Sequence, residues 1–321
     1  MDMNDTPPTL TDPNNMLDLE AAARHYARAS LSDNTRRAYA SDWADFVYWC
    51  KRKNRKPLPA TPDTIALYLT TMADHLKTSS LRRRVTAIRK AHELGKHNSP
   101  TKDETVKAVM RGILRTKGEA QKHASPTLIK EIQRMMAALP DTHKGIRDKA
   151  LLLLGFAGGF RRSELVGLDI EDLALSDEGL VVKIRKSKTD QTRRGRQIGI
   201  TFGSNKDTCP ITALQNWLNI SQIREGALFC PINQWGQLLP TRLTDQSVRL
   251  ILREALQLAG IGIKGFSGHS LRAGFATVAA INGATEREIQ KTTGHLNTEV
   301  LRRYIRDGDI FRQNASRKLG L

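Results

Sequence analysis

The spacing of apolar residues is the feature that most restricts how this 321-residue chain can fold. In one segment after another the apolar side chains recur at steps of three and four residues, which places them on one face of an amphipathic helix. One run, at residues 180–184, is rich in β-branched residues and alone gives a clear strand signal. The spacing therefore predicts a mainly α-helical protein with a small β element.

Four amphipathic helices are predicted in the first third of the chain. One follows Ser32 and Asp33, which are good N-cap residues, and another begins at Thr61 and Pro62, because proline is favoured at the first helical position. The four apolar faces consist of Tyr39, Trp43, Phe46, Val47 and Cys50; Ile65, Tyr68, Leu69 and Met72; Leu81, Val85 and Ile88; and Val106, Val109, Met110 and Ile113. We predict a helical domain over residues 17–115, with a disordered polar tail at 1–16 and a linker at 116–124.

A second domain is predicted over residues 125–321, because Ser125 and Pro126 again have the pattern of a helix start. Helical spacing predicts further helices at 244–259, 271–281 and 285–293. The apolar stretch at 151–160 indicates a buried core helix that is too short to cross a membrane. Strands at 180–184 and 197–200, separated by a basic loop, predict a hairpin and hence a small antiparallel sheet.

The charge of the chain points to its partner. Lys and Arg number 51 against 33 Asp and Glu, which leaves a net charge of +18. A surplus of this size implies a polyanion, either nucleic acid or an anionic membrane surface. Nucleic acid is favoured, because the acidic N-terminal residues form neither a signal peptide nor a transit peptide. Three widely spaced cysteines give no disulfide framework and fit a reducing cytosol.

Two patterns that could carry chemistry are better explained by ordinary structure. Residues 260–265 match GxGxxG, but a dinucleotide-binding fingerprint must follow a strand and open a helix, whereas this one follows a helical pattern. We predict a turn there. Asp169, Glu171 and Asp172 could hold Mg²⁺ in a two-metal nuclease, yet a short acidic run after a helix is usually a solvated loop or a cap. No metal is predicted.

A set of motifs in the second half is more informative than any one of its members. It consists of Gly159-Phe-Arg161-Arg-Ser-Glu164-Leu, Ser187-Lys188-Thr189, Gly268-His269-Ser-Leu-Arg272, Gly294-His295 and Arg303-Tyr304. The other tyrosines, Tyr26, Tyr39, Tyr48 and Tyr68, lie in the first domain, where most are predicted to be in the core. Tyr304 lies among Arg302, Arg303 and Arg306, which suits a nucleophile that meets a phosphate.

Taken together, these motifs resemble the tyrosine recombinase (phage integrase) family, and the similarity covers about residues 17–310. The resemblance implies a SAM-like helical core-binding domain and a mostly helical catalytic domain with a small antiparallel sheet. It implies a site-specific recombinase that cuts and rejoins duplex DNA through a 3′-phosphotyrosine intermediate. Such enzymes act as homotetramers on two specific sites, in some cases with accessory DNA-bending proteins, to integrate, excise or resolve a bacterial mobile element. A cytoplasmic, nucleoid-associated location follows.

The resemblance also assigns roles to residues of this sequence. Tyr304 would be the nucleophile, and Arg161, Arg272 and His295 would donate hydrogen bonds to the non-bridging phosphate oxygens. His269 would transfer the proton of the tyrosine hydroxyl. Neither ATP nor a metal cofactor is expected, because the phosphotyrosine linkage conserves the energy of the broken bond.

For two of these roles the sequence offers a second candidate residue close by. Lys188 of the Ser-Lys-Thr motif would protonate the departing 5′-oxygen, with Lys186 as the alternative. Arg161 is preferred to Arg162 as the catalytic arginine, because in the family pattern a Glu, here Glu164, follows the arginine by three positions. Glu164 is a supporting residue that would orient its neighbours. The i,i+3 spacing of Arg161 and Glu164 predicts that both lie on one face of a helix.

The DNA-contacting residues are predicted from their place on helices. The candidates are Arg36, Arg37, Lys77, Arg82, Arg83 and Arg84 in the first domain and Gln246 and Arg249 in the second. The predicted helix around Leu81 and Ile88 carries a run of basic residues on its other face, as a helix lying against phosphates would. The apolar C-terminal residues Ile310, Phe311, Leu319 and Leu321 could dock into a neighbouring subunit or pack within their own chain.

Two other functions are compatible with the sequence. A type IB topoisomerase shares the 3′-phosphotyrosine chemistry but relaxes supercoils without bringing two sites together. A DNA-binding protein that has lost catalysis would form no covalent adduct, although the complete set of candidate residues argues against it.

Overall fold

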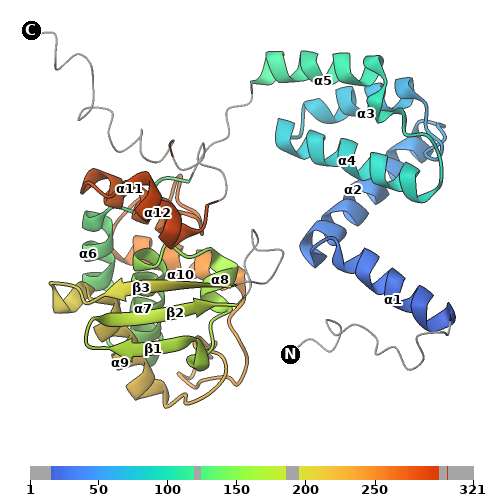
Figure 1. Cartoon of the computed structure of the whole chain (residues 1–321). Helices are drawn as coiled ribbons and strands as arrows, with labels where there is room; N and C mark the ends of the chain where they lie inside the picture. The colour runs from blue at the N-terminus through green and yellow to red at the C-terminus, as the bar shows by residue number, and fades with distance from the viewer. Residues whose placement is uncertain (1–15, 119–123, 186–194, 296–301, 303–321) are drawn as a thin grey trace, which may run out of the picture. The chain divides into compact units, whose positions relative to one another are not determined.

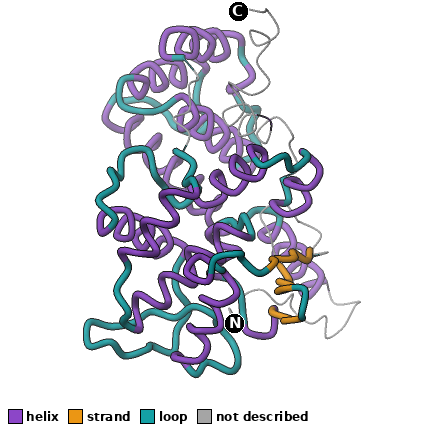
Figure 2. The backbone as a smooth tube through the Cα atoms, turned by 90° about the vertical axis from the view of Figure 1, so that its left-hand side faces the viewer, coloured by secondary structure: helices purple, strands orange, loops and turns teal. Residues whose placement is uncertain are grey.

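A computed structural model of the chain describes residues 16–118, 124–185, 195–295 and 302. The chain divides into two compact units, Met1–Gln121 and Lys122–Leu321, which are treated one at a time below. Both units consist mainly of helices, and a small sheet belongs to the second (Figure 1, Figure 2). The expectation of a mainly helical protein with a small antiparallel sheet is confirmed.

The first unit contains the helices that the apolar spacing predicts. The described elements are α1 (Met16–Ala29), α2 (Asp33–Arg52), α3 (Pro62–Ala73), α4 (Thr78–Leu94), the 3₁₀ helix η1 (Pro100–Lys102) and α5 (Glu104–Lys117). Ser32 and Thr61 cap α2 and α3, since their side chains accept the backbone N–H groups of Thr35 and Thr64. Helix α5 extends to Lys117, two residues into the predicted linker.

An aromatic cluster between α2 and α3 forms the core of the first unit. The rings of Phe46 and Trp49 meet the ring of Tyr68 edge-on, with centroids 5.0 and 5.4 Å apart. The expectation that most tyrosines of this unit are in the core was wrong, because Tyr26 and Tyr48 are each 63% exposed. Tyr48 follows the buried Phe46 by only two positions, which on a helix places it on the opposite side.

The second unit is larger and packs its helices against one face of a small sheet, whose two longer strands alternate between buried and exposed residues (Figure 1). Its described helices are α6 (Ile129–Ala138), α7 (His143–Ala157), α8 (Arg162–Val166), α9 (Pro210–Ser221), α10 (Asp245–Leu258), α11 (Ser270–Ile281) and α12 (Glu286–Thr293), with the 3₁₀ helices η2 (Ile170–Asp172) and η3 (Lys206–Thr208). Helices α10, α11 and α12 agree with the predicted ranges to within one residue. Residues 260–265 lie between helices as a turn and loop, as predicted.

Helix α6 begins at Ile129 and not at Pro126, so the predicted start was wrong. The residues before it are held by the start of α11 instead. The backbone N–H groups of Ser125 and Thr127 donate to the carbonyl oxygens of Gly265 (2.9 Å) and Ser270 (3.1 Å). Leu128 is the N-cap of α6, because its backbone is extended (ψ 172°) and its N–H donates to Glu131 Oε2 (3.0 Å) in the first turn.

The sheet has the order β1 (Leu173–Ser176), β2 (Gly179–Ile184) and β3 (Arg196–Thr201), with both pairs antiparallel. The pair β2–β3 is the predicted hairpin, and Ile184 lies opposite Arg196 at its open end. Strand β1 was not predicted, because it is four residues long and three of them are exposed, so no alternation marks it. Residues 186–194, which include Lys186 and Lys188, lie outside the described residues.

Helix α7 is the centre of the second unit. Five consecutive residues, at 150–154, are buried, and the helix packs against α8, α9, α10 and α11. Gly155 permits this close approach, because a Cβ there would lie 2.8 Å from Leu165 and 3.1 Å from Leu271. The apolar stretch is therefore a core helix, as predicted. Among the described residues no helix is long and apolar enough to cross a membrane.

We expect Leu152→Ala to lower the free energy of unfolding of the second unit by about 3 kcal/mol, because it leaves a cavity in the fully buried centre of α7. The matched control is Leu250→Ala on α10, where the side chain is half exposed and a change of about 0.5 kcal/mol or less is expected. Urea unfolding followed by circular dichroism measures both. Equal effects of the two substitutions would contradict the central place of α7.

Candidate active site

Arg161 stands at the N-cap of α8, and Glu164 reaches back to it from the first helical turn. The backbone N–H of Arg161 donates to Glu164 Oε2 (2.9 Å), and its guanidinium Nη1 donates to Glu164 Oε1 (2.5 Å). The predicted pairing of the two residues is therefore correct, but it arises from a cap and not from one face of a helix. Guanidinium Nη2 also donates to the carbonyl of Gly294 (3.2 Å).

Arg272 is buried on the first turn of α11 and connects three segments of the unit. Its Nη1 donates to the carbonyl oxygens of Gly159 (2.7 Å), in the turn after α7, and Thr293 (2.6 Å), at the end of α12. Arg161 bonds the next carbonyl along the chain, that of Gly294. The two arginines, 111 positions apart in the sequence, thus converge on the end of α12.

His295 follows the left-handed C-cap Gly294 of α12. Together with Arg161, Glu164 and Arg272 it forms a cluster of charged and polar side chains. Thr293 has one hydroxyl proton, which it donates to the carbonyl of Ile289 (2.7 Å). Its oxygen therefore accepts from His295 Nδ1, 2.8 Å away, so the proton of the neutral imidazole is on Nδ1. Nε2 then carries a lone pair and can donate to a phosphate only after protonation.

The surroundings of His295 oppose that protonation. Burial is the largest cause, and the positive charges of Arg272, Arg161 and Arg196 add to it, lowering the pKa of His295 to about 3. An anion bound beside the three guanidinium groups would offset their charge and raise this pKa again. The donor role that the resemblance gives His295 therefore depends on a bound anion.

Arg196 is a member of the cluster that the sequence reading missed. Its Nη2 donates to Glu164 Oε2 (3.0 Å), and its Nη1 donates to the carbonyl of Thr292 in the last turn of α12. A signal was available in strand β3, where Arg196 has the same parity as the buried Ile198 and Ile200. A cation on the inward face of a strand needs a buried acceptor, and Glu164 supplies it.

The remaining predicted catalytic residues are placed less fully. His269 is exposed at the N-cap of α11, three residues before Arg272, and its backbone N–H donates to Ser267 Oγ (3.2 Å). Tyr304 and Lys188 lie outside the described residues. Arg162 points away from the cluster toward Asp245, with 3.6 Å between Nη2 and Oδ2.

The acidic run after α8 is engaged in ion pairs. Asp169 and Asp172 both accept from the guanidinium of Arg185, and Asp169 also accepts from Arg242. Glu171 accepts the backbone N–H of Gly226 (3.0 Å). Within the described ranges no group of three His, Cys, Asp or Glu side chains could hold a metal ion. The interpretation of this run as a cap and loop agrees with these contacts.

The predicted DNA-contacting residues of the first unit fall into two groups. Arg36, Arg37, Lys77 and Arg82 are exposed, and within α2 itself Arg36 bonds Asp33 and Arg37 bonds Asn34. Arg83 and Arg84 face acidic residues of α2: Arg83 donates to Asp42 through Nε (2.7 Å) and Nη2 (3.1 Å), and Arg84 bonds Asp45 and Tyr68. The side chain of Arg84 is only 13% exposed, so the expectation that α4 presents it to phosphates was wrong.

The two candidates of the second unit lie on one side of α10. Gln246 is exposed in its first turn, and Arg249, three positions later, is half buried. Gln246 is thus the more accessible of the two.

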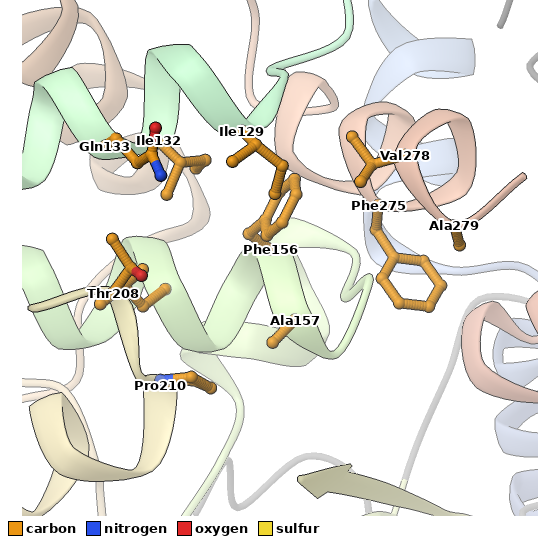
Figure 3. A pocket seen from close by; sticks show the side chains of 11 residues that line it. Ile129, Ile132, Gln133, Phe156, Ala157, Thr208, Pro210, Phe275, Val278 and Ala279 are labelled. Carbon is orange, nitrogen blue, oxygen red and sulfur yellow. The ribbon is translucent and has the colours of Figure 1, made fainter. Parts of the chain in front are cut away.

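An apolar cavity of about 290 Å³ lies between α6, α7, α11 and the start of α9. Figure 3 shows Phe156 of α7 and Phe275 of α11 in its wall, together with Ile129 of α6. Val278 and Ala279 complete the α11 side. None of the cluster residues described above lines this cavity.

Both units are similar to known protein families. A family model described as the phage integrase family matches residues 127–309, and one described as the phage integrase N-terminal SAM-like domain matches residues 25–97. The integrase/recombinase XerD homolog of Selenomonas ruminantium is 42% identical over 307 residues, covering 94% of this chain and 89% of that protein. Recombinase Cre of Escherichia phage P1 is 25% identical over 302 residues, with 88% and 86% covered.

A solved structure shares the fold. A lambda integrase tetramer bound to a Holliday junction matches with a TM-score of 0.58 at 18% identity, covering 92% of this chain and 78% of that one. Both the helical first unit and the catalytic fold expected for the second are therefore confirmed at the level of architecture.

The depressed pKa of His295 predicts a dependence of stability on pH. As the pH falls below about 6.5, the unfolded chain binds a proton that the native imidazole, with a pKa of about 3, does not bind. The free energy of unfolding is therefore expected to fall between about pH 6.5 and pH 4 more steeply in the wild type than in His295→Gln. Urea unfolding across this range tests it, with the exposed His143→Gln as the control that keeps the wild-type slope. Identical slopes in wild type and His295→Gln would refute the prediction.

Proposed function

The chain belongs to the phage integrase family and is a tyrosine recombinase that cuts and rejoins DNA, and from this premise we propose that it recombines two specific duplex sites with Tyr304 as the nucleophile. The observation that carries the proposal is the convergence of Arg161 and Arg272 on neighbouring carbonyls of α12, next to His295. Two guanidinium groups held in this way form a preorganised site for a phosphodiester.

The proposed reaction is a transesterification at phosphorus. The phenolate oxygen of Tyr304 bonds to phosphorus as the bond to the 5′-oxygen breaks, which leaves a 3′-phosphotyrosine and a free 5′-hydroxyl. His269 takes the phenol proton, and Lys188 gives a proton to the departing oxygen. Arg161 and Arg272 bind the non-bridging oxygens, whose negative charge grows in the transition state. Attack by a 5′-hydroxyl from another strand reverses the step.

The negative charge of the substrate also changes the protonation state of His295. The phosphodiester is an anion, so its binding favours the protonated imidazole, which then has an N–H at Nε2. The histidine thus becomes a third donor when the substrate is present. The exchange replaces one phosphoester by another, so we propose that it requires neither ATP nor a resident metal.

DNA binding is proposed to involve both units, over residues 17–115 and 125–321, joined by 116–124. In the first unit the exposed cations Arg36, Arg37, Lys77 and Arg82 are the proposed phosphate contacts. In the second, Gln246 on α10 is the proposed base contact, since an exposed amide can pair with adenine. Arg83, Arg84 and Arg249 are assigned a secondary part, because Arg83 donates two hydrogen bonds to the buried Asp42 of another helix and the other two are partly buried.

We further propose that a homotetramer carries out the exchange on two sites. Lambda integrase forms a tetramer on a Holliday junction, and this chain shares its fold. The apolar cavity beside α11 is the proposed acceptor for the C-terminal residues Ile310, Phe311, Leu319 and Leu321 of a second copy. Its apolar lining matches the chemistry of that segment. Bacterial and phage relatives favour a mobile element as the biological setting.

The nucleophile is tested with a nicked duplex built from the DNA that flanks the coding sequence of the protein in its genome. The wild type is expected to form an SDS-resistant protein–DNA adduct, Tyr304→Phe is expected to form none, and EDTA is expected to change neither result. Cleavage that persists in Tyr304→Phe and stops with EDTA would contradict the mechanism in favour of a metal-dependent nuclease. Exchange of ends between two differently marked duplexes separates a recombinase from a topoisomerase.

The tetramer is tested by Ala279→Glu, which places a charge in the apolar cavity. Association of protein–DNA complexes, measured by analytical ultracentrifugation, is expected to weaken at least about tenfold, because a buried unpaired carboxylate costs on the order of 2 kcal/mol or more. Binding to a single site is expected to stay within about twofold of the wild type. Unchanged association would show that this cavity does not hold the segment of a second copy.

A further inference from the structure

We propose that Arg196 is a positioning residue that holds Glu164, and through it Arg161, and that keeps the charge of this carboxylate from cancelling the charge of Arg161. The inference rests on the proposed function of the arginine cluster and extends it to a residue outside the motifs of the sequence. Arg196 acts through Glu164 and the end of α12, and it is not assigned a contact with the substrate.

The first observation is how Glu164 is held. Its side chain is 1% exposed, so each carboxylate oxygen needs donors from the protein. Oε1 accepts from Arg161 Nη1 (2.5 Å), and Oε2 accepts from both the Arg161 backbone N–H (2.9 Å) and Arg196 Nη2 (3.0 Å). Arg196 is therefore the one of the two cations that approaches the carboxylate from outside α8. Its removal leaves Oε2 with a backbone donor alone and allows the carboxylate to rotate.

The second observation is what the other end of the same guanidinium does. Its Nη1 donates to the carbonyl of Thr292, and the group packs against Gly294, where a Cβ would lie 2.8 Å from Nη1. The carbonyl of Gly294 accepts from Arg161, and His295 follows it in the chain. One planar side chain thus ties the cap of α8 to the end of α12. A lysine would have a single ammonium and could not span two acceptors in the same way.

The third observation concerns charge. Glu164 with Arg161 alone would be a neutral buried pair, and the carboxylate that orients Arg161 would also cancel its attraction for a phosphate. With Arg196 added, the three groups carry one net positive charge. The carboxylate can then act as an orienting acceptor while the cluster stays cationic. Burial lowers the pKa of the Arg196 guanidinium and Glu164 opposes that shift, which is the pattern of a buried cation maintained by its counter-ion.

The chain offers a matched control at the other side of the hairpin. Arg185 directly follows β2, and Arg196 begins β3 opposite Ile184. Both arginines form carboxylate pairs, but Arg185 pairs with Asp169 and Asp172 and contacts none of the cluster residues in the described part of the chain. Arg185→Gln therefore removes a comparable ion pair from the same end of the sheet.

The experiment measures the rate of covalent adduct formation on the nicked flanking-DNA duplex under single-turnover conditions, and the dissociation constant for that duplex. Arg196→Gln is expected to slow adduct formation by about 10- to 100-fold and to change the dissociation constant by about twofold at most. Arg196→Lys, which keeps the charge without the fork, is expected to recover part of the rate. Arg185→Gln is expected to react within about twofold of the wild type. Equal losses in Arg196→Gln and Arg185→Gln, or a wild-type rate in Arg196→Gln, overturn the proposal.

A second measurement needs no DNA and separates this inference from the recombinase mechanism. The ¹⁵N–¹H signal of Arg161 Nε, identified by its loss in Arg161→Lys, is expected to be sharp in wild type and in Arg185→Gln and to be broadened or lost in Arg196→Gln. If the wild type forms no adduct, the proposed function fails, while this signal still decides the role of Arg196. A sharp Arg161 signal at its wild-type position in Arg196→Gln overturns it. Should Arg196→Gln not fold, Arg196→Lys is compared with Arg185→Gln in its place, and an unchanged signal has the same meaning.

Discussion

The second unit, which has the catalytic fold, must hold several guanidinium groups close together in a partly buried place. Like charges at this distance repel one another, and burial adds a desolvation cost. Both costs are offset by hydrogen bonds from the guanidinium groups to one carboxylate, Glu164, and to backbone carbonyls at the ends of α7 and α12. The packing of α7 against its neighbours fixes where those helix ends lie. The apolar core therefore supports the site, because burial of apolar side chains stabilises the helix ends to which the charged cluster bonds.

Much of this arrangement could be predicted from the sequence, and the successes have a common cause. Helices α2, α3, α10, α11 and α12 and the hairpin β2–β3 have a strong periodicity, and all of these helices except α11 have a Ser or Thr cap; both are local signals. The failures come from contacts between distant segments. The extended residues before α6 bond to residues 265 and 270, and β1 pairs with β2 although most of its side chains are exposed. The role of Arg196 depends on a carboxylate 32 residues away, although its strand parity marked it as inward-facing.

The first unit shows why counting basic residues overstates the surface available to DNA. Helix α4 carries a dense run of arginines, but α2 places Asp42 and Asp45 against two of them. Both cations join α4 to α2, and Arg84, which also bonds the hydroxyl of Tyr68, is largely buried, so part of the positive charge of α4 is neutralised within the protein. The exposed cations Arg36, Arg37, Lys77 and Arg82 define a smaller surface. A net charge of +18 is therefore an upper bound on what a polyanion can meet.

The arginines of the cluster are oriented largely by main-chain oxygens of residues 159, 292, 293 and 294. A carbonyl oxygen is the same whatever side chain its residue carries, so substitution at such positions leaves the acceptor in place as long as the backbone path is kept. At Gly159 and Gly294 the positive φ angles favour glycine, and a Cβ would lie 2.9 Å from Phe275 and 2.8 Å from Arg196, respectively. The orientation of the arginines therefore depends on the course of the backbone at these four positions. Substitutions elsewhere in the unit that leave the ends of α7 and α12 in place are expected to leave these arginines in the same orientation.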